Sequence, residues 1–201
     1  MVEKKISSNL LLKKYLINDK RIEHSVSTAL FMKRYARTFN IDPDKSYLCG
    51  LYHDLAKDMN DSDIIKFSSA FKERGIFEIN YFDYKVKYPV LLHGVAACEI
   101  LIIELGITDF DILKSIAHHT TGGVKLSDMA KFTFVADYAE PLRGFSEAAK
   151  LKKILIKEKS LNKAYFLSYY FQINHLLQKR RSICPEYLDG YNEAVELIKT
   201  T

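Results

Sequence analysis

Apolar residues recur at steps of three and four positions along most of the chain, which is the spacing of amphipathic helices. The first such stretch begins at Ile22 and ends near Asn40. A second begins at Asp42-Pro43 and continues to His53, because Asp is a favourable N-cap and Pro fits the first helical position, where no N–H is needed. The pattern therefore predicts two helices in the first quarter of the chain.

The same helical spacing continues beyond these two segments. Further helices are predicted over residues 61–71, 90–105, 108–119, 127–139, 146–157, 160–177 and 185–199. Thr108 and Asp111 have the spacing of a capping box, so we expect them to start the helix that carries His118 and His119. Residues 76–88 are aromatic and irregular, and we expect a strand-like arm or a lid over a pocket there.

Composition supports a helical fold. The 201 residues include only 8 Gly and 4 Pro, which many-turned β architectures use heavily, and the 48% of hydrophobic residues can build an ordinary core. No linker or internal repeat divides the chain. We therefore predict an all-α fold in one domain over residues 1–201, with a core at about 18–145 and C-terminal helices at about 146–199 that complete it.

Charge and cysteine content restrict the partners and the compartment. The net charge of +5 suits an anionic ligand, but it is too small and too dispersed to indicate a nucleic-acid binder. The lysines between positions 150 and 159 are interpreted as a solvated helix face. Cys49, Cys98 and Cys184 form no C-x-x-C pair, which favours a reducing cytoplasm. Acidic residues interrupt the longest apolar run, at residues 100–103, so no membrane span is expected.

Five short polar motifs stand on or beside different predicted helices. They contain His24, His53-Asp54, His93, His118-His119 and Asp137. Packing these helices around one centre would bring imidazoles and carboxylates together from distant parts of the sequence. Asp137 lies within an apolar helix face, where a carboxylate is costly without a partner. A metal ion is the simplest partner, although an arginine could also serve.

Each motif also has an ordinary structural interpretation. A His-Asp dipeptide occurs by chance in roughly one chain in three of this length. His24 alone could be a polar residue on a helix flank, and His118-His119 could be a solvated helix C-terminus. Adjacent helical residues diverge by about 100°, so only one of His118 and His119 should point inward. His175 has no comparable context and is interpreted as structural or exposed.

Imidazole and carboxylate together are the ligands of borderline or hard divalent ions such as Fe, Mn, Zn, Co and Mg. His24, His53, Asp54 and Asp137 would fill four coordination positions and leave two open in an octahedral ion, for a water and a phosphate oxygen. A cation in that position activates water for attack on phosphorus and neutralises the charge that develops there. Because the set lacks cysteine and retains open positions, it favours a catalytic site over a structural one.

The combination H…HD…D, with two intervening histidines and helices throughout, resembles the HD-domain metal-dependent phosphohydrolase superfamily. More narrowly, five motifs resemble the YqeK family over residues 10–199. These motifs are Arg21-x-x-His24, Gly50-Leu51-Tyr52-His53-Asp54-Leu55-Ala56-Lys57, Leu92-His93-Gly94, His119-Thr120-Thr121-Gly122 and Val135-Ala136-Asp137-Tyr138-Ala139-Glu140-Pro141-x-Arg143. The last two are specific to the narrower family, whereas the H…HD…D frame alone marks only the superfamily.

This resemblance implies a single HD-domain helical bundle around a metal site. It also implies a symmetrical bis(5′-nucleosyl)-tetraphosphatase, which cuts diadenosine tetraphosphate into two ADP, with iron as the metal. The metal ligands it implies are His24, His53, Asp54 and Asp137, and the catalytic residues it implies are His24, Asp54, Lys57, His93 and His119. The residues implied to face the nucleotide are Arg21, His24, Lys57, His93, His119, Thr120, Asp137, Arg143, Arg180, Arg181, Ser182, Ile183, Cys184 and Pro185.

The chemistry of the remaining groups follows from the polyanionic substrate. Lys57 and Arg143 would neutralise phosphate oxygens. His93 and His119 would stabilise the leaving phosphate if protonated, or bind a second metal ion with Asp54 as a bridge if neutral. The sequence leaves open whether one ion or two are bound.

Three alternative functions remain open from the sequence alone. The chain could be an HD-domain phosphohydrolase acting on a nucleoside monophosphate or a cyclic nucleotide, or a non-catalytic nucleotide-binding module that signals through a partner. Its basic charge also permits an RNA-binding accessory protein. The aromatic residues between Ile76 and Tyr84 are interpreted as core or as the contact of a homodimer, and a platform on which bases stack is the alternative.

Overall fold

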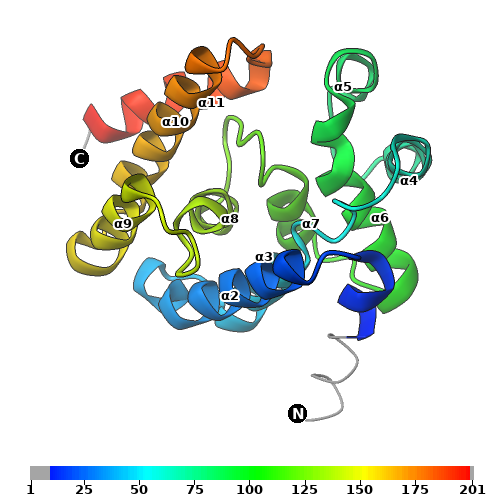
Figure 1. The fold of residues 1–201 in the computed structure, drawn as a ribbon, viewed down its shortest axis with the longest axis horizontal. Coiled ribbons are helices and arrows are strands. Elements are labelled where there is room, and N and C mark those ends of the chain that lie inside the picture. Colours follow the sequence, from blue (N-terminus) through cyan, green and yellow to red (C-terminus); the bar gives the residue numbers. More distant parts are fainter. Residues whose placement is uncertain (1–9, 200–201) are drawn as a thin grey trace.

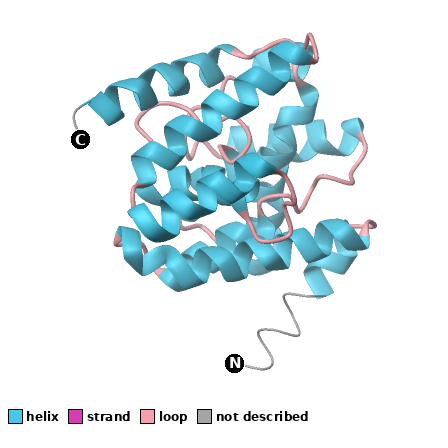
Figure 2. Ribbon diagram, turned by 60° about the vertical axis from the view of Figure 1, so that its left-hand side comes forward, coloured by secondary structure: helices cyan, strands magenta, loops and turns pink. Residues whose placement is uncertain are grey.

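The computed structural model describes residues 10–199, except for the side chains of residues 81–83. Within that range the regular elements are helices, and none of the residues forms a strand (Figures 1 and 2). The predicted all-α fold is confirmed. No helix of this described part is both long enough and apolar enough to cross a membrane.

The helices follow one another with short connections. Residues 10–15 are helical and precede α2 (Asp19–Tyr35), η1 (Ala36–Phe39), α3 (Pro43–Tyr52) and α4 (Asp61–Glu73). The next elements are α5 (Tyr81–Lys87), η2 (Pro89–Leu92), α6 (His93–Leu105), α7 (Phe110–Ala117) and α8 (Asp128–Ala139). The last described elements are α9 (Ser146–Lys153), η3 (Ile154–Glu158), α10 (Leu161–Gln178) and α11 (Pro185–Lys199).

Polar side chains cap the helices that carry the predicted motifs. The Asp42 carboxylate accepts hydrogen bonds of 2.8 Å from the two backbone N–H groups that follow Pro43, at the start of α3. The Ser127 hydroxyl accepts one of 3.3 Å from the N–H of Ala130, at the start of α8. These groups satisfy backbone donors that have no partner within the helix. Both predicted starts are confirmed.

The predicted capping box at the start of α7 is wrong. Asp109, and not Thr108, is the N-cap, and its carboxylate accepts hydrogen bonds of 3.1 Å from the N–H groups of Asp111 and Ile112. One carboxylate satisfies two N–H groups at once, so the helix begins at Phe110. Since α7 ends at Ala117, the His118-His119 pair lies at its C-terminus and in the following turn.

The strand-like arm predicted for residues 76–88 is also wrong, because α5 forms there. The N–H of Tyr84 donates to the carbonyl of Asn80 at 3.2 Å, and the N–H of Tyr88 donates to the carbonyl of Tyr84 at 2.9 Å. Pro89 then starts the 3₁₀ helix η2, which separates α5 from α6 and divides the helix predicted over 90–105. Helical hydrogen bonds thus satisfy the backbone N–H and carbonyl groups of α5, although its aromatic residues do not recur at a clear helical spacing. The role of a lid stays a prediction.

Helix α8 lies at the centre of the bundle (Figure 1). It packs against α2, α3, α7, α9 and α10, and nearly all of its side chains are buried. In Figure 1, α10 and α11 lie on one side of α8, whereas α4, α5 and α6 lie on the other. A polar residue at the last turn of α8 is therefore surrounded by residues from several helices.

Helices α2 and α3 pack closely, because Gly50 has no side chain. A Cβ atom at Gly50 would lie 2.7 Å from the Cα of Ala29 in α2, which is closer than real Cβ contacts allow. This close approach brings the beginning of α2, with His24, beside the end of α3, with His53.

Candidate metal centre and its surroundings

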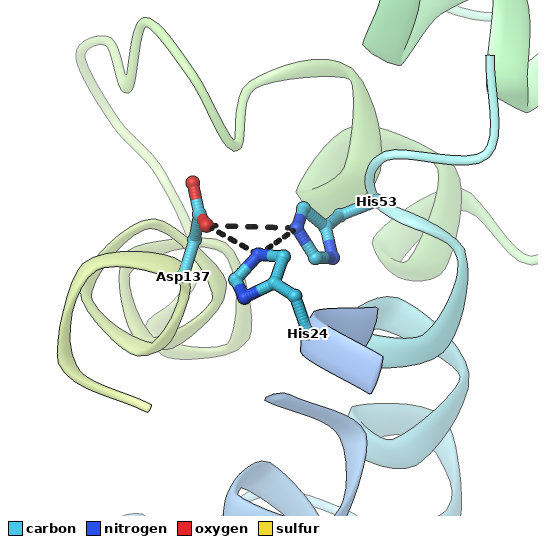
Figure 3. A group of neighbouring side chains, drawn as sticks. All are labelled: His24, His53 and Asp137. Carbon is cyan, nitrogen blue, oxygen red and sulfur yellow. Dashed lines mark hydrogen bonds and ion pairs between the residues drawn. The ribbon is translucent and has the colours of Figure 1, made fainter. Parts of the chain in front are cut away.

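Three side chains from different elements meet beside the end of α8. His24 comes from α2, His53 follows the last residue of α3, and Asp137 lies in the last turn of α8. They point toward one another (Figure 3). His24 Nε2 lies 2.9 Å from Asp137 Oδ1 and 3.1 Å from His53 Nε2, and His53 Nε2 lies 3.6 Å from the same Oδ1. We call these residues the first cluster.

Hydrogen bonds to groups outside the first cluster orient both of its histidine rings. His53 Nδ1 donates a hydrogen bond of 2.8 Å to the carbonyl oxygen of Gly50, and His24 Nδ1 donates one of 3.2 Å to Glu140 Oε1. Each ring therefore uses its Nδ1 hydrogen outside the cluster and turns its Nε2 atom inward. This is the arrangement that metal-binding histidines commonly have, so the donor set of the first cluster fits a divalent cation.

A second cluster adjoins the first and consists of Asp54, His93 and His119. Asp54 Oδ1 lies 3.0 Å from His93 Nε2 and 3.3 Å from His119 Nε2, and the two Nε2 atoms are 3.0 Å apart. The Nδ1 atoms of His93 and His119 donate hydrogen bonds of 2.7 Å to backbone carbonyls. Neutral rings of this tautomer present two nitrogen lone pairs to a carboxylate oxygen, so the group attracts a donor or a cation. Asp54 Oδ2 lies 3.8 Å from His53 and connects the two clusters.

Lys57 and Thr120 supply donors to the second cluster. Lys57 Nζ lies 3.0 Å from His93 Nε2 and 3.4 Å from Asp54 Oδ1. The Thr120 hydroxyl lies 2.9 Å from His119 Nε2. The structure thus brings Lys57 and Thr120 together beside the second cluster, and their contacts with a phosphate group stay a prediction.

The carboxylates of both clusters are held in their charged form. Burial opposes the charge of Asp54, but its contacts with His53, His119 and His93 outweigh this effect, so the pKa of Asp54 lies well below its usual value. Burial also opposes the charge of Asp137, and hydrogen bonds with His24 and His53 hold its pKa well below the usual range. Buried carboxylates that stay charged are suited to binding a cation.

The pKa of His24 in the first cluster and the pKa values of the two histidines in the second cluster are shifted in opposite directions. Burial lowers the pKa of His24, but hydrogen bonds to Asp137 and Glu140 dominate and raise it to about 9. Burial, together with the neighbouring imidazoles, lowers the pKa of His119 to about 4. Burial and the charge of Lys57 lower the pKa of His93 as well. Near neutral pH the second cluster therefore holds neutral imidazoles.

Arg143 and Arg21, two of the four arginines predicted to face the nucleotide, lie in different surroundings. Arg143 Nη2 donates to Asp137 Oδ1 at 2.8 Å and lies 3.3 Å from His24 Nε2, so its guanidinium stands at the first cluster. Arg21 instead forms an ion pair with Asp58, with 2.7 Å between Nε and Oδ1. Sequence reasoning gave no indication of this pairing.

A cavity of about 410 Å³ opens beside the second cluster. Its lining includes Thr120, together with Tyr88 and Leu91 from the segment between α5 and α6, and Gln172, His175 and Leu176 from α10. Within the predicted segment 180–185, its lining includes Arg181, Ser182 and Cys184. Arg180, Ile183 and Pro185 are not among the lining residues of the cavity.

The two adjacent histidines at the end of α7 point in different directions. His119 belongs to the second cluster, whereas His118 Nδ1 donates a hydrogen bond of 3.0 Å to the carbonyl of Gly122, and its ring lies beside Phe77. The expectation that one of the pair points inward is confirmed, and the inward residue is His119.

Two residues that support the site, Glu140 and Tyr169, were not among the predicted site residues. Glu140, which holds His24, is part of a motif, but nothing in the sequence shows that its carboxylate turns back toward α2. The loop that carries His119 and Thr120 is held by Tyr169 of α10, whose hydroxyl accepts a hydrogen bond of 2.9 Å from the N–H of Gly123. No local signal in the sequence predicts this long-range contact.

Known proteins resemble this chain over nearly its whole length. It is 29% identical to the symmetrical bis(5′-nucleosyl)-tetraphosphatase of Halalkalibacterium halodurans over 88% of this chain and 90% of that protein. It is 28% identical to the protein of the same name from Staphylococcus aureus over 94% of this chain and 95% of that protein.

A solved structure has the same fold. It is the crystal structure of a protein from Clostridium acetobutylicum described as a predicted HD superfamily hydrolase involved in NAD metabolism. The TM-score is 0.82 at 29% identity, and the match covers 96% of this chain and 97% of that one. The sequence profile of the HD domain matches residues 21–142, a range that contains both clusters. The chain therefore belongs to the HD domain family.

Proposed function

We propose that the protein hydrolyses diadenosine tetraphosphate symmetrically and releases two ADP. The observation that carries this proposal is the meeting of His24, His53 and Asp137 beside the second cluster, next to a cavity large enough for a small ligand. The names of the relatives from Halalkalibacterium halodurans and Staphylococcus aureus, which match nearly the whole chain, support the same reaction.

The first cluster and Asp54 fit a divalent cation, and we propose iron. His24, His53 and Asp137 present two inward-facing Nε2 atoms and one carboxylate, and Asp54 Oδ2 lies 3.8 Å from His53 Nε2. With Asp54 these groups form a mixed donor set without sulfur, which suits Fe, Mn, Zn, Co or Mg. When bound, such a cation supplies Lewis-acid activation of water and neutralises charge on the phosphate. Elemental analysis of freshly purified protein tests the identity of the metal.

The neutral rings of the second cluster favour one of two roles for His93 and His119. A residue that donates a proton to a leaving phosphate must be protonated near neutral pH, and the lowered pKa values of both rings oppose this. Neutral imidazoles beside the charged Asp54 carboxylate are instead suited to hold a second cation. We therefore propose that Asp54 serves both clusters.

We propose that two cationic side chains, Lys57 and Arg143, bind the polyphosphate. Lys57 lies at the second cluster and Arg143 at the first, so a phosphate chain that crosses both clusters would meet a positive charge at each end. Arg143 can bind two phosphate oxygens through its planar guanidinium, whereas Lys57 acts as a point charge. Together they would hold the substrate so that the reacting phosphorus stays in one position.

We propose that one nucleoside of the substrate occupies the cavity beside Thr120. Tyr88, Tyr138 and Tyr187 contribute aromatic surface to its lining, on which a base can stack. Arg181 and Ser182 contribute polar groups that can bind the sugar or the first phosphate. Contacts of Arg180, Ile183 and Pro185 with the nucleotide stay a prediction from the family resemblance.

Product analysis tests this function. The purified protein, loaded with Fe²⁺ or Mn²⁺, is incubated with diadenosine tetraphosphate in water enriched in ¹⁸O, and the products are separated by ion-exchange chromatography. We expect ADP alone, with one labelled ADP for each unlabelled one. Formation of ATP and AMP would contradict symmetrical cleavage.

A panel of other nucleotides separates the alternative functions. Turnover of a nucleoside monophosphate or a cyclic nucleotide, with diadenosine tetraphosphate left intact, would assign the chain to another HD-domain phosphohydrolase activity. Nucleotide binding by calorimetry without turnover under any divalent ion would favour a signalling module.

A further inference from the structure

Glu140 contacts His24 on the side of the ring that faces away from His53 and Asp137. It follows the last residue of α8, and only 1% of its side chain is exposed. Its Oε1 atom accepts the hydrogen bond of 3.2 Å from His24 Nδ1. Because a neutral imidazole carries one N–H hydrogen, placing that hydrogen on Nδ1 leaves the lone pair on Nε2. Nε2 is the atom that faces His53 and Asp137.

The other oxygen of Glu140 is fixed independently. Oε2 accepts a hydrogen bond of 2.7 Å from the backbone N–H of Leu142 and one of 2.5 Å from the hydroxyl of Ser27. A backbone N–H can only donate, so the atom at this position must be an acceptor. Leu142 therefore determines which end of the side chain faces His24.

We propose that Glu140 is a positioning residue that fixes the tautomer of His24 and so makes His24 Nε2 available to a divalent cation. This inference rests on the proposed function, because it concerns the same cation site. Partners of this kind behind metal-binding histidines typically change metal affinity by about 10- to 100-fold when they are mutated.

The variant Glu140→Gln separates this role from packing. Gln has the shape of Glu, but one end is an acceptor and the other a donor. The N–H of Leu142 requires the amide oxygen at the Oε2 position, so the amide NH₂ group turns to His24 Nδ1. His24 must then accept at Nδ1 and carry its hydrogen on Nε2, which blocks the cation. Removal of metal affinity by an isosteric change is a result that a merely structural role would not give.

The test measures Co²⁺ affinity by competition with a chelating indicator, in the full chain freed of metal. Glu140→Gln should weaken Co²⁺ binding by about 10- to 100-fold while helix content is retained. Ser27→Ala is the matched control, because it removes a contact to the same carboxylate but leaves Leu142 in place. It should bind Co²⁺ as the wild type does. Equal affinity in Glu140→Gln and the wild type, or an equal loss in Ser27→Ala, would overturn the inference.

A second measurement needs no variant and covers the case in which Glu140→Gln does not fold. In wild-type protein loaded with Zn²⁺, ¹⁵N NMR of the imidazole ring should show His24 bound to the metal through Nε2 and protonated at Nδ1. Binding through Nδ1 would overturn the inference even if the protein is active. If the wild type binds neither Co²⁺ nor Zn²⁺, the cation site of the proposed function is itself wrong, and the inference is overturned with it.

Discussion

Asp54 and His93 meet where the two clusters join, with 3.0 Å between the carboxylate Oδ1 and the imidazole Nε2. The other oxygen of Asp54 faces His53 at 3.8 Å. One carboxylate, with its residue only 6% exposed, therefore faces both groups of histidines. This relationship makes Asp54 the residue whose loss should affect both clusters together.

Asp54→Ala should lose the bound metal and reduce turnover of diadenosine tetraphosphate by about a thousandfold or more, because a metal ion contributes several kcal/mol to the stabilisation of charge on phosphorus. Helix content should be retained, since Asp54 lies in the turn after α3. Elemental analysis and product chromatography check the two effects. The exposed Asp189 of α11 provides the control Asp189→Ala, which should keep both metal and turnover. Full activity in Asp54→Ala would remove this residue from the site.

His118 and His119 are adjacent at the end of α7, so the same substitution at each position compares an inward-facing histidine with one that points away from the second cluster. His119→Asn removes the imidazole that lies 3.3 Å from Asp54, so turnover should fall by about 10- to 100-fold. His118→Asn changes a side chain that contacts Gly122 and Phe77, so kcat should stay close to that of the wild type. Steady-state kinetics of both variants check this. A larger loss in His118→Asn than in His119→Asn would reverse the assignment of the inward residue.

Arg143→Ala should weaken the binding of ADP by about tenfold or more, because a charge-assisted hydrogen bond to a phosphate contributes about 1.5–3 kcal/mol. The metal should be retained, since Arg143 contacts the first cluster but contributes no metal ligand. Calorimetry of the metal-loaded protein with ADP measures the change. Arg143→Lys keeps the charge without the planar guanidinium and should recover only part of the affinity. An unchanged affinity in Arg143→Ala would exclude Arg143 from the nucleotide site.

The polar motifs of the site could be predicted from the sequence because they interrupt an otherwise apolar helical pattern. Asp137 shows this best: a carboxylate on the buried helix α8 needs a partner, and the structure places His24 at 2.9 Å. The Asp42-Pro43 start of α3 was likewise predictable, because the cap acts on its own helix. Local chemistry therefore determined the features that the sequence could predict.

The features that the sequence did not predict depend on contacts between distant segments. Glu140 turns toward His24 because the backbone N–H of Leu142 holds its other oxygen, and no spacing in the sequence shows that geometry. Arg21 pairs with Asp58 for the same kind of reason. Helix α5 was missed for a local reason, because the aromatic residues at 76–88 show no clear helical period in the sequence.

Tyr169→Phe tests whether the hydrogen bond between Tyr169 and Gly123 stabilises the loop that carries His119. The change removes a fully buried hydroxyl that accepts a hydrogen bond from the N–H of Gly123, and it leaves that N–H without its partner. The free energy of unfolding should fall by about 1–3 kcal/mol, measured by urea unfolding. Tyr170→Phe on the next position is the control, because Tyr170 is 48% exposed and its change should stay within about 0.5 kcal/mol. Equal stability of the two variants would contradict the role of this hydrogen bond.

His24 should make the stability of the metal-free protein depend on pH. Hydrogen bonds to Asp137 and Glu140 overcome the effect of burial and raise the pKa of His24 to about 9, from 6.5. Because the folded pKa lies above the unfolded value, the stabilisation is complete below about pH 6.5 and is lost as pH rises through 9. The free energy of unfolding should thus fall by up to about 3 kcal/mol between these pH values. Urea unfolding with a chelator present measures the fall, and His24→Gln should lack this contribution; the same fall in both proteins would assign it to other groups.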